Sequence, residues 1–225
     1  TCAMVIDFLG KSLESARIEC GGKLSVKTVL MLADQMISSV QFLHCCNLIH
    51  RDIKPQNIFL DKDFHPVLSD LGFSRIFSEI SMTNNLGTPY YMAPELFGDD
   101  DLTLKIDVYA YGVSILQMFS PKLRFPNRQP RDISQFVKMV KEGTRFVIPK
   151  DVPEFYVSLI TKCWDPSPSK RPSFTEIIQM FEENDDFMLP GSDKEEVKAF
   201  IEELNKYVAD GQLTPSSTET KSFPF

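Results

Sequence analysis

The feature that most limits how this chain can fold is a run of helical periodicity over residues 25–43. Apolar side chains recur there at intervals of about three and four, from Val26 and Val29 through to Val40 and Leu43. That spacing places them on one face of a helix. The run therefore predicts a long, largely buried helix.

Further helical patterns follow, and a region of short, strand-like apolar runs lies between them and the long helix. The brief apolar runs Ile58–Leu60 and Pro66–Leu68 flank a turn-like Asp-Lys-Asp, which predicts a small hairpin. The fold class we expect is mainly α, a helical bundle around a short β-hairpin. The other predicted helices lie around Ser12–Ile18 and at about 103–119, 132–142, 154–164 and 173–183.

Composition narrows the class of protein. The 225 residues are 43% hydrophobic and 24% charged, as in ordinary globular domains. The net charge of −7 argues against nucleic acid as a partner, because that function usually needs a basic face. No apolar run approaches the roughly 20 residues of a membrane span. The five cysteines lack paired spacing and are expected to be buried, reduced thiols, so we expect an intracellular, cytoplasmic location.

The residues that carry chemistry follow the long helix, where His50–Asn57 reads His-Arg-Asp-Ile-Lys-Pro-Gln-Asn. Phosphoryl transfer to a hydroxyl needs positioned charges, magnesium ligands and a carboxylate that faces the hydroxyl. Asp52 supplies a carboxylate, Lys54 an ammonium group and Asn57 an amide oxygen. Asp70 stands at the far end of the hairpin and can meet Asn57, because a hairpin returns its end close to its start. Two such oxygen ligands suit magnesium.

Five motifs in this order resemble those of eukaryotic protein kinases. Each one alone has a bland alternative, such as surface charge or a turn signal, but the order and spacing match jointly over roughly residues 3–183. The motifs are the catalytic loop His50–Asn57, the magnesium-binding Asp70-Leu71-Gly72, the segment-closing Met92–Glu95, the central-helix Asp107–Gly112, and Cys163–Pro166 with Lys170–Pro172.

The resemblance implies a role for each polar residue. Asp52 would accept the proton of the substrate hydroxyl, Lys54 would neutralise the transferring phosphate, and Asn57 and Asp70 would hold magnesium. ATP and Mg are thus the implied cofactors, and a protein is the substrate. The spacing of Asp52 and Lys54 favours serine or threonine over tyrosine as the acceptor. Thr88 agrees, because in such kinases a threonine at this place bonds to the catalytic Asp and Lys.

On the adenine side, Asp7, Phe8 and Leu9 resemble the hinge, whose backbone groups bind the base. Ile6 would be the gatekeeper, and Phe59 would form the apolar floor under the purine. A hydrophobic strand and a hairpin would show such residues in any case.

The resemblance also implies two structural contacts. The family pairs the equivalents of Glu95 and Arg171 as an ion pair under the activation segment, and Asp107 would brace the backbone of the catalytic loop. Within the family, the first third of the chain resembles casein kinase I, for example at Leu9–Leu13. The remainder resembles the tyrosine-kinase-like serine/threonine group, notably from Asp70 onward.

The region before Ile6 offers no glycine-rich loop and no lysine-bearing strand, so the small lobe is expected to be missing from these residues. Residues 1–185 would be the hinge and large lobe, and 186–225 a C-terminal helix and disordered tail. Either the chain is a fragment of a full kinase, or its product is truncated and inactive. Residues 1–225 alone are expected to transfer no phosphate. The rival function is an inactive kinase-like scaffold that binds proteins through its helical face.

Overall fold

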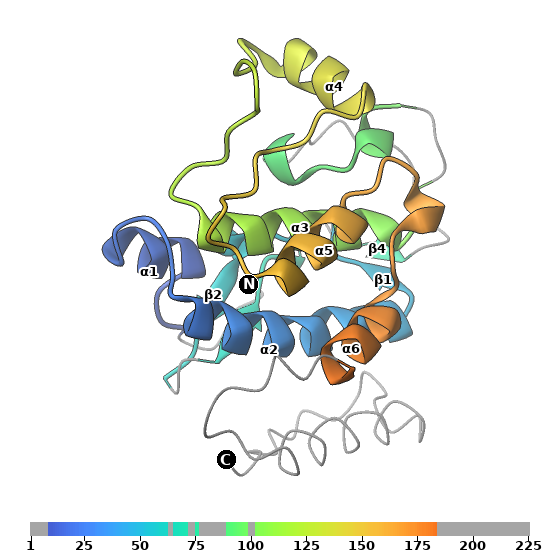
Figure 1. Ribbon diagram of the computed structural model, residues 1–225. Coiled ribbons are helices and arrows are strands. Elements are labelled where there is room, and N and C mark those ends of the chain that lie inside the picture. The colour runs from blue at the N-terminus through green and yellow to red at the C-terminus, as the bar shows by residue number, and fades with distance from the viewer. Residues whose placement is uncertain (1–8, 63–64, 72–74, 77–88, 99–101, 184–225) are drawn as a thin grey trace, which may run out of the picture. The chain divides into compact units, whose positions relative to one another are not determined.

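A computed structural model describes residues 9–62, 65–71, 75–76, 89–98 and 102–183. This part of the chain is mainly α-helical, with a small antiparallel hairpin beside the helices (Figure 1). The predicted fold class is confirmed, and the predicted helix limits agree with the observed ones to within about two residues. The helices are α1 (Leu13–Glu19), α2 (Val26–Cys45), α3 (Lys105–Phe119), α4 (Ile133–Lys141), α5 (Glu154–Cys163) and α6 (Phe174–Glu182).

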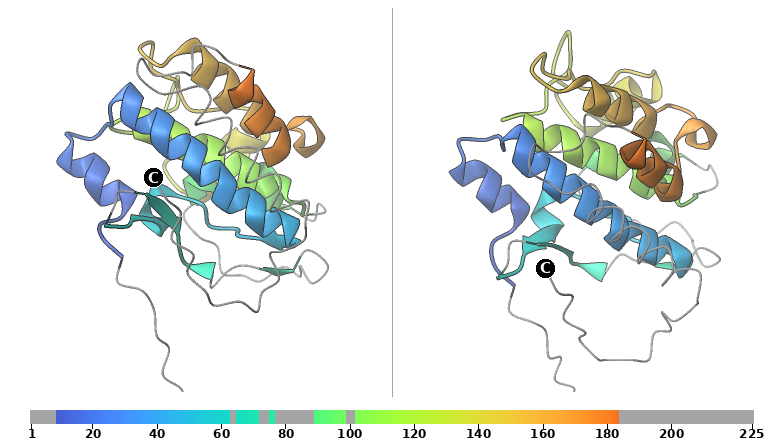
Figure 2. Two further views of the ribbon diagram at one scale, coloured as in Figure 1. Left: turned by 90° about the horizontal axis from the view of Figure 1, so that it is seen from below. Right: turned by 60° about the horizontal axis from the view of Figure 1, so that its bottom comes forward.

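The long helix α2 begins where its sequence provides a cap. Ser25 lies in extended conformation before the first turn, and its side chain accepts a hydrogen bond from the backbone N–H of Thr28. This satisfies one of the N–H groups that a helix start leaves free. The apolar face predicted from the sequence is buried, including Val29, Ile37 and Val40. It packs against α3, α6 and the strand β3 (Pro66–Leu68), and Figure 2 shows α2 from two further directions.

Helix α3 forms the centre of the large helical layer, because every residue from Ile106 to Phe119 is buried. It contacts both α2 and α5. A Cβ atom on Gly112 would lie 2.6 Å from Cβ of Cys163, so only glycine permits this approach of α3 to α5. On the other side, the hydroxyl of Tyr111 donates to the carbonyl of Ala33 at 3.1 Å and ties α3 to α2.

The predicted hairpin is confirmed. Strand β2 (Ile58–Leu60) pairs antiparallel with β3, with Ile58 opposite Leu68. The incoming chain runs along the other edge of β2, where the Gly10 amide donates to the Leu60 carbonyl at 2.9 Å. A Cβ atom on Gly10 would lie 2.6 Å from that carbonyl oxygen, which explains the glycine. The hairpin thus sits between the start of the described chain and the catalytic loop.

Shorter elements complete the described architecture. Strand β1 (Leu48–Ile49) pairs with β4 (Arg75–Ile76). The 3₁₀ turns, in the same labelling, are η1 (Pro55–Asn57), η4 (Pro89–Tyr91), η5 (Pro94–Phe97) and η6 (Pro168–Lys170). None of the described helices is long and apolar enough to cross a membrane.

The prediction of buried cysteines is only partly correct, and the predicted domain limits are not tested. Cys163 is buried, but Cys20 and Cys45 are exposed free thiols, so the expectation of buried cysteines is wrong there. Both stand at helix ends, where fewer neighbouring elements cover the side chain. The domain limits at 185 and 186 stay predictions, because the C-terminal segment lies outside the described residues.

Candidate active site

The catalytic loop is held by a buried carboxylate on α3. Asp107, which is 0% exposed, accepts hydrogen bonds from the backbone amides of His50 at 2.8 Å and Arg51 at 2.9 Å. Arg51 has a φ of 72°, in the left-handed region that a non-glycine residue rarely adopts. The two bonds hold the chain in this turn. The bracing role that the resemblance implied for Asp107 is confirmed. The ring of His44 on α2 also contacts Asp107, at 2.9 Å.

The loop then brings three polar side chains into one cluster. The ammonium group of Lys54 lies 2.6 Å from Oδ2 of Asp52. The amide N–H groups of Asn57 donate to the same Oδ2 at 2.8 Å and to the carbonyl of Asp52 at 2.9 Å. Asp52 is only 6% exposed. The cluster therefore holds a carboxylate in one orientation through two donors, beside the surface.

The end of the hairpin is fastened to this cluster. Ser69 donates to the Asn57 carbonyl from both its amide, at 2.8 Å, and its hydroxyl, at 2.9 Å. The ring of His50 lies 3.0 Å from the Ser69 carbonyl. Asp70, the next residue, is exposed and has a φ of 64°. The chain reversal predicted from the hairpin thus places Asp70 one residue from an anchor on Asn57.

The oxygen donors at this point fit magnesium. Asn57 uses its NH₂ group on Asp52, and its amide oxygen is the atom suited to a cation. The Asp70 carboxylate could serve as a second hard oxygen ligand. Two protein ligands are typical where magnesium also binds substrate phosphates and water. The described residues contain no group of three His, Cys, Asp or Glu side chains arranged for a metal, so any metal here would rely on this amide and carboxylate.

The structure describes only some of the residues that the sequence predicts to bind adenine. Leu9 and Phe59 are both half-buried, and Ser12 forms an isolated antiparallel bridge with Phe59. The segment that begins at Leu9 is therefore next to the strand that carries Phe59. The remaining predicted residues lie outside the described residues; they are Ile6, Asp7, Phe8 and Thr88.

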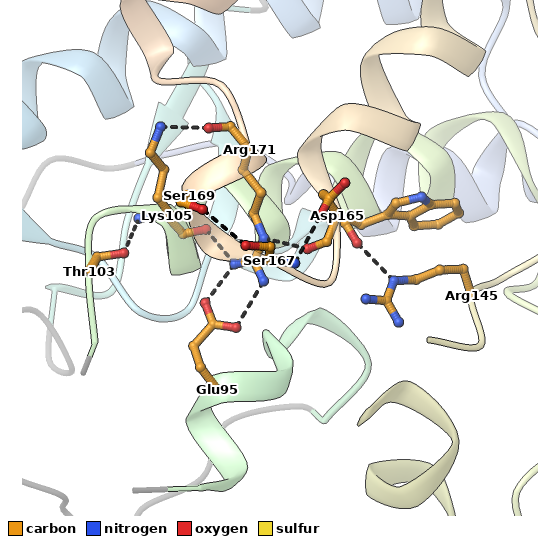
Figure 3. A network of polar contacts seen from close by, with 9 residues as sticks. Glu95, Thr103, Lys105, Arg145, Asp165, Ser167, Ser169 and Arg171 are labelled. Atoms are coloured by element: carbon orange, nitrogen blue, oxygen red, sulfur yellow. Dashed lines mark hydrogen bonds and ion pairs between the residues drawn. The ribbon is translucent and has the colours of Figure 1, made fainter. Parts of the chain in front are cut away.

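A second charged group joins the segment-closing motif to the chain before α6 (Figure 3). Arg171 binds both carboxylate oxygens of Glu95, at 2.6 and 2.9 Å. Arg171 is 1% exposed and Glu95 5%. The guanidinium also donates to the carbonyls of Asp165 and Lys105. The predicted ion pair is confirmed, and the guanidinium makes four hydrogen bonds in all.

Comparison with known proteins decides the family. A family model described as the protein kinase domain matches residues 1–181. The chain belongs to the protein kinase domain family. The match runs through all five motifs and ends one residue before the last residue of α6.

Several curated kinases are similar to this kinase domain. One is the RGS domain-containing serine/threonine-protein kinase A of Dictyostelium discoideum, 36% identical over 143 residues, or 64% of this chain and 12% of that protein. A probable LIM domain-containing serine/threonine-protein kinase of the same organism is 36% identical over 167 residues, or 74% and 25%. A serine/threonine/tyrosine-protein kinase of Arabidopsis thaliana is 30% identical over 169 residues, or 75% and 43%. The chain therefore spans less than half the length of these relatives.

Sequence reasoning missed two residues that hold the kinase domain together. His44 lies in the helical run and carries no signal beyond its place there. Arg145 stands alone between predicted helices, yet its guanidinium lies 5.6 Å from the centre of the Tyr109 ring, and that of Arg171 lies 5.1 Å from the same centre. Arg145 also donates to the Trp164 carbonyl at 2.8 Å. Only the tertiary structure brings two arginines to one ring.

Proposed function

We propose that this kinase domain carries the site for ATP- and Mg-dependent transfer of a γ-phosphoryl group to serine or threonine hydroxyls of proteins. The observation that carries the proposal is the cluster of Asp52, Lys54 and Asn57 on a clamped loop, with Asp70 beside it. Phosphoryl transfer depends almost wholly on positioned charge. The cluster supplies charge of both signs, and hydrogen bonds and an ion pair fix its members.

In this proposal, Asp52 faces the acceptor hydroxyl and takes its proton. The bonds from Lys54 and Asn57 to Oδ2 support that role, because they keep the carboxylate from rotating. Lys54 would offer its remaining N–H groups to the phosphoryl oxygens. Thr88 would bond to Asp52 and Lys54 from the activation segment.

The nucleotide and metal would occupy the neighbouring edge. Asn57 and Asp70 would hold magnesium, which supplies charge neutralisation at the phosphates when bound. Asp7 and Leu9 would bind the adenine through backbone groups, and Phe59 would pack beneath it. The half-buried state of Leu9 and Phe59 supports this, since a partly covered apolar surface suits a flat aromatic ligand.

The acceptor is proposed from one residue and from the relatives. Lys54 stands two residues after Asp52, as in kinases that act on serine and threonine. The relatives named above carry serine/threonine kinase in their names, and one carries tyrosine as well. A protein substrate and an intracellular location, where ATP is plentiful, complete the proposal.

The test is labelled-phosphate transfer from ATP to a generic protein substrate by the full-length protein, followed by analysis of the phosphorylated amino acids. We expect label on serine or threonine, lost when a chelator removes magnesium. Asp70→Asn should lower transfer by about 10²–10³-fold, because one metal ligand loses its charge. Asp151→Asn is the control, since Asp151 is an exposed carboxylate paired with Lys23. Transfer by Asp70→Asn at the wild-type rate would refute the assignment, and no transfer by the wild type would favour the scaffold.

A further inference from the structure

A cavity of about 410 Å³ opens between the start of α3, the end of α5, the turn η6 and the outer side of α6. It borders the buried ion pair, because Arg171 is one of its lining residues. Three lysines line it, together with a hydroxyl and the side chains of α6. The lining residues that matter here are Lys105, Lys162, Ser169, Lys170, Glu176 and Met180.

The positive groups in this cavity are largely free to bind something else. Lys162 and Lys170 are exposed. Lys105 donates one hydrogen bond to the carbonyl of Arg171, at 2.6 Å, as Figure 3 shows. An ammonium group has three N–H donors, so two of those of Lys105 remain. The guanidinium of Arg171 is directed to Glu95 instead.

The negative groups around the cavity are partly occupied. Glu176 caps the start of α6, where its Oε2 accepts from the Ser173 amide at 2.6 Å and from the Ser173 hydroxyl at 2.8 Å. These bonds, and to a smaller extent the charge of Lys105, lower the pKa of Glu176. Glu183 lies at the far end of α6 and is exposed. The lysine side of the cavity is therefore the side on which an anion is attracted.

The charges of two of these lysines act on the buried thiol of Cys163. Burial raises the pKa of the Cys163 thiol to about 12, and the charges of Arg171, Lys105 and Lys162 act in the opposite sense. Cys163 is the last residue of α5 and is fully buried. Cations on separate elements thus converge on one region, although the whole chain has a net charge of −7.

We propose that this cavity binds a phosphate monoester dianion between Lys105, Lys162 and Lys170. A tetrahedral group with several charged oxygens can accept hydrogen bonds from donors on three different sides at once, and bonds to ammonium groups are the stronger, charge-assisted kind. A carboxylate presents only two oxygens in one plane. The hydroxyl of Ser169, which lies 3.0 Å from that of Ser167, adds a further donor at the η6 edge.

Two sources carry this chemistry, a small phosphate ester and a phosphorylated side chain of a peptide. Both present the same dianion to the lysines. A peptide adds contacts to the half-buried Met180 and Pro172 at the cavity wall, whereas a small ester does not. The binding does not depend on phosphotransfer, so it can be tested apart from the catalytic proposal.

The experiment follows the methyl resonance of Met180 by NMR in the full-length protein labelled at methionine methyl groups. Met31, exposed on α2, is the reference methyl. Inorganic phosphate, then O-phosphoserine and then a phosphoserine peptide are titrated into the protein. Chloride at the same ionic strength is the control. A saturable shift of Met180 with both phosphates, and none with chloride, is the expected result. Tenfold tighter binding of a phosphoserine peptide than of inorganic phosphate would identify the peptide as the source, and equal binding the small ester.

Variants then locate the site. The double variant Lys162→Gln/Lys170→Gln should weaken binding by about tenfold, because two charge-assisted bonds are lost. Both lysines are exposed, so the fold should be kept. Lys122→Gln/Lys150→Gln removes the same charge from two exposed positions outside the cavity lining and should bind as the wild type does. The proposal is wrong if chloride shifts Met180 as phosphate does, or if the two double variants bind phosphate equally.

Discussion

Two charged clusters in this protein are built from the same kinds of side chain in opposite ways. At the catalytic loop, Asp52 meets Lys54 and Asn57 in a largely buried cluster, on a backbone with a positive φ at Arg51. Between η5 and η6, Glu95 meets Arg171 in the interior. The backbone that carries the first cluster is braced from α3, through Asp107. The second is held by its own side chains.

The difference separates chemistry from stability. A buried carboxylate and guanidinium that satisfy each other's bonds can take on no substrate, and removing either leaves an unpaired buried charge. The catalytic cluster keeps donors and acceptors for a ligand, and its geometry is imposed from α3. We therefore expect changes at Glu95 or Arg171 to act on folding, and changes at Asp52 to act on turnover.

The largest effect on folding is expected from Arg171→Met. This change leaves Glu95 buried without its partner, so the free energy of unfolding should fall by about 3–5 kcal/mol. Chemical denaturation of the full-length protein, followed at the kinase domain, measures it. The contrast between the two clusters fails if Arg171→Met lowers the free energy of unfolding by no more than the loss of an exposed ion pair does.

The variant Lys138→Met breaks such an exposed pair and serves as the comparison. Lys138 lies 3.9 Å from Glu142, and both side chains are well exposed, at 73% and 60%. Such pairs contribute about 0–1 kcal/mol. The ratio between the two variants therefore measures how much burial adds to an ion pair of the same charges.

A smaller effect is expected from Asp34 on α2, a half-buried carboxylate that forms no ion pair among the described residues. Burial raises the pKa of Asp34 to about 6, from 3.8. Asp34→Asn should raise the free energy of unfolding at pH 7–8 by between about 1 and 3 kcal/mol, because the amide has no charge to desolvate. This sharpens the comparison, since Glu95 is buried with an ionic partner, whereas Asp34 is half-buried and has none among the described residues.

The direction of the pH dependence follows from that shift. Between about pH 4 and pH 6 the unfolded chain has released the Asp34 proton and the folded chain still holds it, so the stability of the wild type should fall as pH rises through this window. In Asp34→Asn the fall should be absent, and the two proteins should agree near pH 4. A difference between them that is the same at every pH would show that charge is not the cause.

How much of the fold and the site could be predicted depends on how far apart the interacting residues lie in the sequence. The hairpin and the polar cluster were predictable because Asp52, Lys54 and Asn57 lie within six residues and a short turn returns Asp70 to them. The long helix was predictable from its apolar spacing. The pair of Glu95 and Arg171 was available only through resemblance, because 76 positions separate them.

Other features had no local signal. A glycine such as Gly112 weakens a helix by its residue type. Its reason here is the close approach of Cys163, which only the tertiary structure shows. The burial of Asp34 and the place of Arg145 over Tyr109 depend on how α5 and the loop before it pack, which periodicity does not encode. The exposed thiols of Cys20 and Cys45 show the same limit, since residue type alone favours burial.

The most direct test of the division between chemistry and stability is Asp52→Asn, measured for turnover and for unfolding in the same full-length protein. Labelled-phosphate transfer should fall by about 10²–10⁴-fold, because the general base is lost. The free energy of unfolding should change by less than about 2 kcal/mol, because the backbone bonds to Asp107 remain and an amide oxygen can still accept from Asn57. Wild-type turnover in Asp52→Asn, or a loss of stability as large as that of Arg171→Met, would contradict the account.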